Sequence, residues 1–509
     1  MDVLMTHVTS KITLILFVNT AETALKYSLD NLFLNNPING GIVKRKLLTG
    51  AAIASTSLVI AASPALAQGN TEASAIVQTV MDNLWVFIAG ILVFFMQAGF
   101  ALVEAGLTRS KNVANIMAKN IADMCIGVIA FFAVGYAFAY GGGGGWFIGS
   151  GSWFLSGSSL FELPAASLND DGIWVSGGLS GATDFFFQVV FAATAVTIAS
   201  GAMAGRTKFS AYLLFSALMT AFIYPVVVHW TWGGGLITEH INWGSALSYS
   251  DFAGSGIVHL TGGVAAFMGA RALGPRIGKY DEDGKPRAIP GHNIVFTVIG
   301  VFILWLGWFG FNPGSELAAD GLVMSVAVNT LIAAAAGGAV SAIVVVAKTG
   351  KPDVGMIGNG VLGGLVGITA GCGAFNTFGS FITGAVAGAL VVYSVLFIEK
   401  KGIDDPVGAV SVHGTCGVWG VLAIGLFSRY DDAFLGRDDA GLFYGGGFAQ
   451  LSVQAVMVIL IIAWTALAAG ISFTIIKKTT GLRVSAEEEI AGLDVSEHGS
   501  SGYHMDSTN

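Results

Sequence analysis

The chain has 509 residues, of which 54% are hydrophobic and 11% charged, with 71 glycines and a formal net charge of −8. Soluble domains carry about 25% charged residues, so this composition excludes an ordinary soluble protein. The acidic balance provides no basic surface for nucleic acid, and the three cysteines (Cys125, Cys372 and Cys416) lack the spacing of disulfide frameworks, zinc sites or redox motifs.

The first 67 residues have the features of a secretory signal peptide. A basic start at residues 44–46 precedes a short apolar stretch that ends in the small-residue pattern Ala-Leu-Ala at residues 65–67. We expect cleavage after Ala67 and translation starting near Val43, so that this upstream extension is absent from the mature protein. A transmembrane helix is the alternative, but the apolar stretch is short and rich in serine and alanine.

Apolar windows of about twenty residues recur along the rest of the chain, and each can cross a hydrocarbon layer of about 30 Å. We predict an all-α polytopic membrane protein with eleven transmembrane helices in residues 68–476 and a cytoplasmic tail in residues 477–509. The predicted spans are 82–105, 112–140, 184–204, 208–230, 252–273, 291–311, 323–346, 357–374, 380–398, 409–427 and 447–476. The many glycines inside these spans are typical of close helix packing in membranes.

The basic residues predict an orientation. Removal of a signal peptide leaves the new N-terminus outside, and eleven crossings then leave the C-terminus inside. The loops assigned to the inner side, with the tail, contain Arg109, Lys111, Arg206, Lys208, Arg271, Arg276, Lys279, Lys285, Arg287, Lys348, Lys351, Lys400, Lys401, Lys477, Lys478 and Arg483. The outer loops hold Arg429 and Arg437 beside four aspartates. Because positive residues favour the cytoplasmic side, we expect an N-out, C-in protein of the inner or plasma membrane.

Two segments of the chain repeat one pattern. Residues 251–263 read DFAGSGIVHLTGG and residues 405–417 read DPVGAVSVHGTCG, with shared Asp, Gly, Val, His and Gly at offsets 0, 3, 7, 8 and 12. The first segment begins the fifth predicted span and the second begins the tenth, so the two run in opposite directions. This predicts an inverted 5+5 repeat followed by a last helix, an arrangement common in transporters, with substrate sites near the membrane midplane.

The repeat places His259 and His413 at membrane depth. Each lies eight residues from its aspartate, about 12 Å at the helical rise, so both imidazoles approach the bilayer centre from opposite sides. Ionisable groups there are costly and usually line a pathway. A packing role is the alternative for either histidine alone, and the absence of accompanying thiols or carboxylates disfavours a metal site. Asp251 and Asp405 are expected to cap helix N-termini.

Several longer motifs resemble one family. GLTRSKNV (106–113), HWTWGGG (229–235), DFAGSGIVH (251–259), GWFGFNPGS (307–315), VSVHGTCG (410–417), GLRV (481–484) and GLDVSEHG (492–499) are similar to those of ammonium transporters. We identify the chain from about residue 82 to 500 as resembling the Amt/Mep branch of the Amt/Rh superfamily, of the bacterial type. The resemblance implies transport of ammonium or ammonia, no cofactor, no metal and no enzymatic reaction.

The resemblance also implies residue roles. Trp232, Phe191 and Ser315 would form the outer site that recruits ammonium, and Phe191 and Phe311 would form the aromatic gate of the pore. His259 and His413 would be the twin histidines that line the pore. Asp251 and Gln188 would have structural roles beside the recruitment site. In this scheme, ammonium gives up a proton near the gate and ammonia crosses beside the histidines. Methylammonium would act as a substrate analogue.

The family resemblance further implies a homotrimer in the lipid bilayer and a tail that meets a PII-type signal protein. Two alternatives remain open: a Rhesus-type passive channel for ammonia or carbon dioxide, and an ammonium sensor that signals through its tail. Trp232 and Ser315 disfavour the first, because Rhesus-type members lack that cation site. The sequence departs from the family in its longer loops 141–183 and 232–251 and in Gly205, which replaces an acidic residue.

Overall fold

The computed structural model describes residues 71–157, 160–236, 249–429 and 440–503. These residues divide into a small unit, residues 71–74 with 170–174, and a large unit that contains the rest. The expected signal peptide and most of the loop that follows Trp232 lie outside the described residues.

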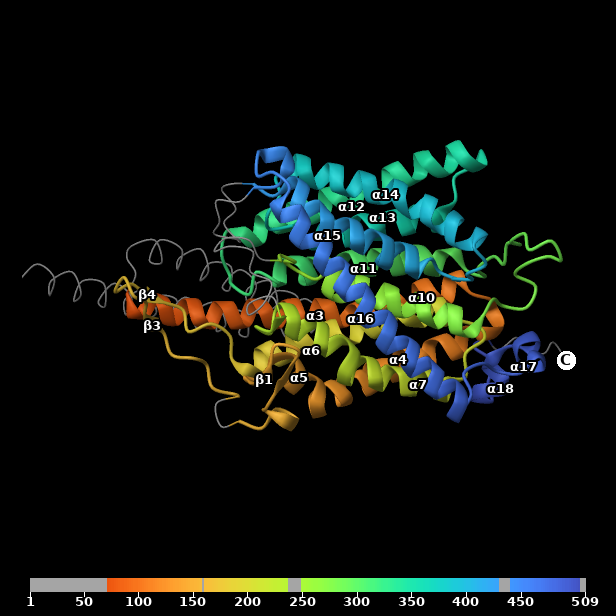
Figure 1. Cartoon of the computed structure of the whole chain (residues 1–509), viewed down its shortest axis with the longest axis horizontal. Helices are drawn as coiled ribbons and strands as arrows, with labels where there is room; N and C mark the ends of the chain where they lie inside the picture. The colour runs from red at the N-terminus through yellow and green to blue at the C-terminus, as the bar shows by residue number, and fades with distance from the viewer. Residues whose placement is uncertain (1–70, 158–159, 237–248, 430–439, 504–509) are drawn as a thin grey trace, which may run out of the picture. The chain divides into compact units, whose positions relative to one another are not determined.

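Within the described residues, ten continuous helical stretches are long and apolar enough to cross a membrane (Figure 1). They are α3 Glu72–Leu107; η1 Ser110–Asn112 with α4 Val113–Ala130, η2 Phe131–Gly135 and α5 Tyr136–Tyr140; α6 Gly181–Met203; α7 Phe209–Leu218 with η4 Met219–Ile223 and α8 Tyr224–Thr231; η5 Ser255–Leu260 with α10 Thr261–Leu273; α11 Ile294–Gly314; α12 Leu322–Thr349; α14 Thr377–Lys400; η6 Val410–Thr415 with α15 Cys416–Phe427; and α16 Ala449–Thr479. An additional apolar helix, α13 Val354–Thr369, has 16 residues.

The remaining elements are short. Two pairs of strands, β1 Gly143–Gly145 with β2 Ile148–Ser150 and β3 Ser167–Leu168 with β4 Trp174–Val175, and the single turn η3 Trp153–Leu155 lie in the segment between α5 and α6. The turn η7 Leu442–Tyr444 precedes α16, and α17 Ala486–Ala491 and α18 Leu493–His498 form the tail. The chain is therefore a helical membrane protein, as the sequence predicts.

Each predicted span coincides with a helical stretch, but the eighth is shorter than expected. The prediction was 357–374, whereas α13 ends at Thr369. The residues that follow turn back on themselves, since the Ala374 and Phe375 backbone N–H groups both bond to the Gly371 carbonyl. The number of crossings and the direction of each remain predictions.

Polar side chains set the beginnings of several helices. Ser180, Asn293, Asp353 and Asn376 precede α6, α11, α13 and α14, and each side chain accepts a hydrogen bond from the backbone N–H three residues later. These caps satisfy donors that have no partner inside the helix. In a membrane such an unpaired donor costs several kcal/mol, so the caps stabilise the helix ends.

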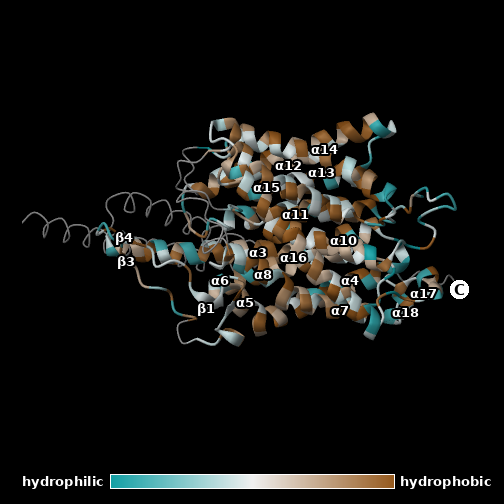
Figure 2. Cartoon of the chain, in the orientation of Figure 1, coloured by the Kyte–Doolittle hydropathy of each residue, from teal (hydrophilic) through white to brown (hydrophobic). Residues whose placement is uncertain are grey.

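The outer surfaces of the helices are apolar. Large hydrophobic side chains such as Phe94, Phe95, Phe302 and Ile343 are exposed, and hydrophobic residues cover the middle of the helices while polar residues gather toward their ends (Figure 2). A soluble protein rarely exposes so much contiguous apolar surface. The distribution fits helices that face hydrocarbon along their middle and water at their ends.

The two repeated segments are built around equivalent caps. The Asp251 carboxylate accepts hydrogen bonds of 2.8–3.0 Å from the four backbone N–H groups of residues 254–257. The Asp405 carboxylate accepts three from residues 407, 408 and 410. The shared glycines at offset 3, Gly254 and Gly408, have φ angles of 107° and 82°, which L side chains rarely adopt. Both aspartates therefore have the capping role expected from the sequence.

The shared glycine at offset 12, Gly263 in one segment and Gly417 in the other, brings the two repeats into contact. A Cβ added at Gly263 would lie 2.2 Å from the backbone nitrogen of Gly414, which follows His413. A Cβ added at Gly417 would lie 3.0 Å from the backbone nitrogen of Leu260, which follows His259. The repeats thus cross at equivalent points, with glycine allowing backbone against backbone. This crossing holds the two histidines at a fixed separation.

We expect Gly263→Ala to destabilise the protein. The added methyl group collides with the backbone of residue 414, which cannot move away as a flexible side chain could, so overpacking should cost about 1–3 kcal/mol. Thermal unfolding in detergent measures the effect. Gly321→Ala is the matched control, because a Cβ there meets nothing within 4 Å. Equal midpoints for the two variants would contradict the close crossing.

A buried ion pair joins the loop that follows α10 to the loop that follows α14. Arg276 donates to both carboxylate oxygens of Asp404 at 2.8 and 2.9 Å, and Arg206 donates to the Asp404 carbonyl. Burial by itself would raise the pKa of Asp404, but the hydrogen bonds and charge of Arg276, with the charge of Arg206, lower it to about 2. Because the pKa of Asp404 is lower in the folded protein than its ordinary value of 3.8, the ionised carboxylate stabilises the fold at any pH above 3.8. This contribution is lost as the pH falls through about 2.

Arg276→Gln should lower the free energy of unfolding by about 3–5 kcal/mol at pH 7, because it leaves a buried carboxylate without its partner. The difference from the parent should persist down to about pH 5 and narrow as pH falls from 4 toward 2. Thermal unfolding across this pH range measures it. Arg287→Gln, at an exposed position in the same loop, is the control. A difference that disappears already at pH 6 would exclude the assigned pKa.

The tail packs against the same loops. Arg483 forms an ion pair with the buried Glu489 at 2.7 Å, and the second Glu489 oxygen accepts from the Ile277 backbone N–H. Asp494 accepts from the backbone N–H of Asn115 in α4. These contacts place α17 and α18 beside the ends of α4 and α7 (Figure 1). The tail up to about residue 499 is therefore an ordered part of the fold.

Candidate functional site

Trp232 lies on the wall of a cavity of about 340 Å³. The residues that line it are Tyr140, Asp184, Phe187, Gln188, Phe191, Trp232, Phe252, Ser315 and Leu317. Trp232, Phe191, Ser315 and Gln188, which come from three different helical stretches, were predicted to lie together, and the structure places all four around this space. We refer to it as the Trp232 cavity.

Two polar side chains of this cavity, Trp232 and Ser315, are held in place by hydrogen bonds to backbone carbonyl groups. Trp232 donates its indole N–H to the Asp251 carbonyl at 3.0 Å, which connects the indole to the aspartate cap. Ser315 donates its hydroxyl to the Phe311 carbonyl at 2.8 Å. The Ser315 oxygen therefore retains its lone pairs as acceptors for a ligand.

Two stacked phenylalanines lie between this cavity and the protein interior. The ring centroids of Phe191 and Phe311 are 4.0 Å apart, with an interplanar angle of 24°, and both side chains are buried. Phe191 also contacts the Trp232 ring edge to face at 6.3 Å. The stacked rings therefore form an apolar layer on the wall of this cavity that faces the histidines.

The two repeat histidines lie directly behind the phenylalanines. The His259 ring stacks on the rings of Phe311 and Trp308, with centroid distances of 5.2 and 5.1 Å. Trp308 is held in place because its indole N–H donates to the Thr369 hydroxyl. His259 Nδ1 and His413 Nδ1 are 3.1 Å apart, so one neutral imidazole donates to the other. His259 Nε2 is buried and has no hydrogen-bond partner among the described residues. This nitrogen is free to bind a small polar molecule.

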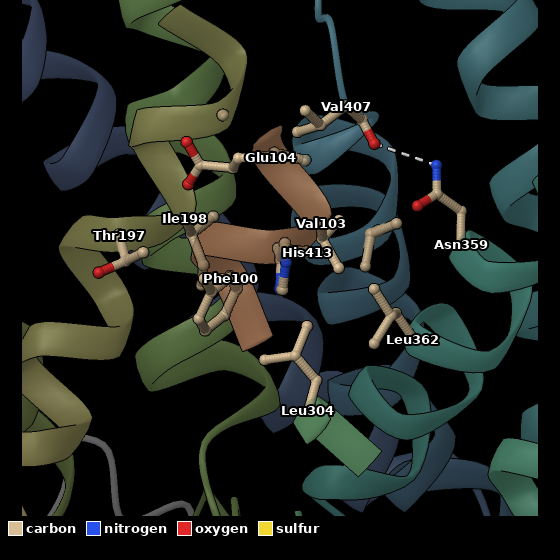
Figure 3. A pocket seen from close by; sticks show the side chains of 13 residues that line it. Phe100, Val103, Glu104, Thr197, Ile198, Leu304, Asn359, Leu362, Val407 and His413 are labelled. Carbon is tan, nitrogen blue, oxygen red and sulfur yellow. Dashed lines mark hydrogen bonds between the residues drawn. The ribbon is translucent and has the colours of Figure 1, made fainter. Parts of the chain in front are cut away.

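A second, smaller cavity adjoins His413. It has a volume of about 30 Å³, enough for one or two molecules of the size of water or ammonia. Apolar side chains such as Phe100, Leu304 and Val412 form most of its wall, together with His413 and Glu104 (Figure 3). We refer to it as the His413 cavity. The order along the path is thus the Trp232 cavity, the phenylalanine pair, the histidine pair and the His413 cavity.

The comparison with known proteins decides the family. The model of the Ammonium Transporter Family matches residues 84–503. The chain belongs to the ammonium transporter family. It is 45% identical to ammonium transporter Amt2 of Archaeoglobus fulgidus over 83% of this chain and 88% of that protein. It is 36% identical to ammonium transporter 1 member 3 of Solanum lycopersicum over 84% and 94% of the two chains.

Solved structures agree with this assignment. A structure titled Sensor Amt Protein is 35% identical, covers 83% of this chain and 99% of its own, and has a TM-score of 0.74. Candida albicans Mep2 is 26% identical, covers 84% and 94%, and has a TM-score of 0.72. The chain is a multi-pass membrane transporter of ammonium or ammonia, and its family members are not enzymes.

Several residues that line the transporter's Trp232 cavity were not predicted from the sequence, and the carboxylate Asp184 is one of them. Asp184 lines this cavity, accepts a hydrogen bond from the Tyr136 hydroxyl at 2.6 Å and a longer one from Gln188 at 3.4 Å. Its position four residues before Gln188 on one helix was the available signal, because such residues share a face. The nearby Glu316 adds little charge at neutral pH, since burial and Asp320 raise its pKa to about 8.

Glu104 and Trp308 were also missed. Glu104 could have been noticed as an acidic residue inside a predicted span, and Trp308 as a member of the motif GWFGFNPGS (307–315). Among the described residues, no group of three or more His, Cys, Asp or Glu side chains is arranged to hold a metal ion. The histidine pair therefore lies in an apolar path without a metal-binding set around it.

Asp184→Asn should weaken apparent ammonium affinity in this transporter by roughly 2- to 10-fold, or about 0.5–1.4 kcal/mol, because the cavity loses its carboxylate. The dependence of uptake on ammonium concentration in proteoliposomes measures the effect. Glu162→Gln, an exposed charge in the loop before α6, is the control. An unchanged half-saturating concentration for Asp184→Asn would show that this carboxylate has no part in recruitment.

Proposed function

We propose that the transporter recruits ammonium at the Trp232 cavity, that ammonium gives one proton to water on the Trp232 side of the phenylalanine pair, and that ammonia then passes His259 and His413. The observation that carries this proposal is the hydrogen-bonded imidazole pair, which is buried beside apolar rings between the phenylalanine pair and the His413 cavity. An imidazole pair of this kind can accept from or donate to ammonia without offering a full charge.

Recruitment follows from the chemistry of the cavity wall. Ammonium is a compact cation with N–H donors, and the faces of Trp232 and Phe191 attract a cation by about 0.5–2 kcal/mol each, depending on desolvation. The Ser315 oxygen accepts a hydrogen bond, and the Asp184 carboxylate supplies negative charge to the same cavity. Gln188 and Asp251 then have structural roles, Gln188 beside Asp184 and Asp251 behind Trp232.

Deprotonation follows from the gate and the path behind it. An ion that enters a narrow apolar path must lose its hydration, and the side chains around Phe191, Phe311 and His259 supply no replacement shell. Neutral ammonia has a far smaller desolvation cost. Potassium has no proton to give up, so the same path excludes it although its size is similar.

The oligomeric state, the membrane and the orientation of the transporter are also proposals. We infer a homotrimer in the inner or plasma membrane, with the N-terminus outside and the C-terminus in the cytoplasm. The exposed apolar helix surfaces support a site for partner subunits or lipid, and the basic loops support the orientation. The ordered tail, held by Arg483, Glu489 and Asp494, supports a surface that a PII-type signal protein could contact.

Two alternatives make different predictions. The similarity to the structure titled Sensor Amt Protein favours an ammonium sensor that signals through the tail as the second candidate. A Rhesus-type channel for ammonia or carbon dioxide is disfavoured, because Trp232 and Ser315 lie together in one cavity with a carboxylate. Currents on solid-supported membranes with ammonium, methylammonium or potassium separate an electrogenic transporter, a neutral gas channel and a non-conducting sensor.

His413→Ala and His259→Asp should change ammonium flux, or its selectivity over potassium, by about tenfold or more, equal to at least about 1.4 kcal/mol at the barrier. The alanine variant removes a hydrogen-bond partner of ammonia, and the aspartate variant places a charge in the path. Uptake into proteoliposomes measures both. His292→Ala, in the loop before α11, is the control. Parent-like flux and selectivity in both variants would exclude the twin-histidine path.

A further inference from the structure

Three ionisable side chains form a buried cluster beside the His413 cavity. Glu104 lies on α3, and Lys119 and Asp123 lie on α4, and all three are at most 2% exposed. Each is within a helical stretch long enough to cross the membrane. Ionisable groups at such a depth are expensive and usually functional.

Ser200 on α6 links the cluster together. Lys119 donates from Nζ to the Ser200 hydroxyl and carbonyl oxygens at 3.0 and 3.1 Å, and the Ser200 hydroxyl donates to Glu104 Oε2 at 2.8 Å. At the other end, Asp123 accepts from the Tyr212 hydroxyl at 2.6 Å, and the Lys119 ammonium group lies 5.1 Å from the centre of the Tyr212 ring. The network is continuous from Glu104 to Lys119 and from Lys119 to the ring that bonds to Asp123.

The charges of this cluster do not balance when all three groups are ionised. Two carboxylates, Glu104 and Asp123, face one ammonium group, and burial makes the surplus negative charge costly. Glu104 Oε1 and Asp123 Oδ1 are also buried without a hydrogen-bond partner among the described residues. A purely structural cluster would be expected to satisfy both atoms. One additional proton on a carboxyl group neutralises the cluster.

Glu104 is the member of the cluster that reaches the transport path. Its side chain is among those that line the His413 cavity, and Figure 3 shows its carboxyl end toward the part of α6 that carries Thr197 and Ile198. The titratable groups around Glu104 are Lys119 and Asp123 on α4, Tyr212 on α7, His413 on η6, Asp405 before η6 and Arg206 after α6. Asp405 is engaged by its backbone donors and Arg206 by carbonyl oxygens.

We propose that Glu104 is a proton-exchange residue of the transport path, which returns a proton to ammonia in the His413 cavity. This rests on the proposed conduction of ammonia past the histidines. The lone pair of NH₃ takes the proton of the neutral Glu104 carboxyl group, so that an N–H bond forms, an O–H bond breaks, and NH₄⁺ and the Glu104 carboxylate result. The carboxylate regains its proton from hydronium in the solution beyond the cavity, which leaves water. Transport in the opposite direction reverses both steps.

The other members of the cluster position and hold this proton. Lys119, through Ser200, stabilises the Glu104 carboxylate after the proton has left. Asp123 supplies the second negative charge, which favours return of the proton before the next ammonia arrives. The cluster thereby keeps both protonation states of Glu104 accessible at a depth where an isolated carboxylate would stay neutral.

The direct test is infrared difference spectroscopy of the reconstituted protein on addition of ammonium. We expect the parent to lose a carboxylic acid C=O band that is absent from Glu104→Gln and weaker in Asp123→Asn, because Asp123 supplies the charge that favours protonation of Glu104. Glu104→Gln keeps the size of the side chain and should reduce ammonium flux about tenfold or more, as expected for loss of a positioned acid or base. Glu104→Asp should restore part of both signals, and Glu162→Gln should match the parent.

The experiment separates failure of the proposed Glu104 role from failure of the proposed function. A parent that conducts ammonium but shows no ammonium-dependent carboxyl band overturns the role of Glu104 without any variant, so poor folding of Glu104→Gln cannot obscure the answer. A band that survives in Glu104→Gln, or a flux in that variant equal to the parent, overturns it as well. A parent that conducts neither ammonium nor ammonia would instead contradict the proposed function itself.

Discussion

The capping of backbone donors by Asp251 and Asp405 is the interaction on which the transport path depends. Each aspartate is followed by a glycine with positive φ and by a π-helical segment, η5 or η6, that carries a histidine. Such irregular backbone leaves N–H groups that hydrocarbon cannot satisfy. The carboxylates satisfy three or four of them on each side. Two regular helices would not turn the imidazoles toward each other in this way.

The polarity of the path changes from one end to the other in a manner that suits a cation that must lose a proton. The Trp232 cavity combines aromatic faces with the Asp184 carboxylate, whereas the next layer consists of the stacked Phe191 and Phe311 rings. The imidazole pair then offers hydrogen bonds but no fixed charge, and the His413 cavity again has a carboxyl group, Glu104, on its wall. A residue with a carboxyl group thus lies at each end of a path whose middle has none.

Much of this arrangement could be predicted from the sequence, because membrane segments leave strong signals. The helical class followed from apolar windows, and the repeated aspartate–histidine pattern predicted both the caps and the meeting of His259 with His413. The end of the eighth span was predicted wrongly, since hydropathy does not register the turn at residues 370–375. Asn329 fixes that turn by donating to the carbonyls of Cys372 and Phe375, a contact between distant segments that a local window cannot contain.

The sequence by itself determined that the chain is a helical membrane protein and that two of its segments repeat one pattern with a histidine in each. Those features depend on local composition and on spacing along one chain. The tertiary structure decided which side chains share a cavity: Asp184 with Trp232, and Glu104 with His413. It also decided that the Lys119 ammonium group lies between two carboxylates rather than beside one. These relations depend on how separate helices pack. In a membrane, helices pack closely where small residues meet, and the pattern along the sequence does not specify which helices become neighbours.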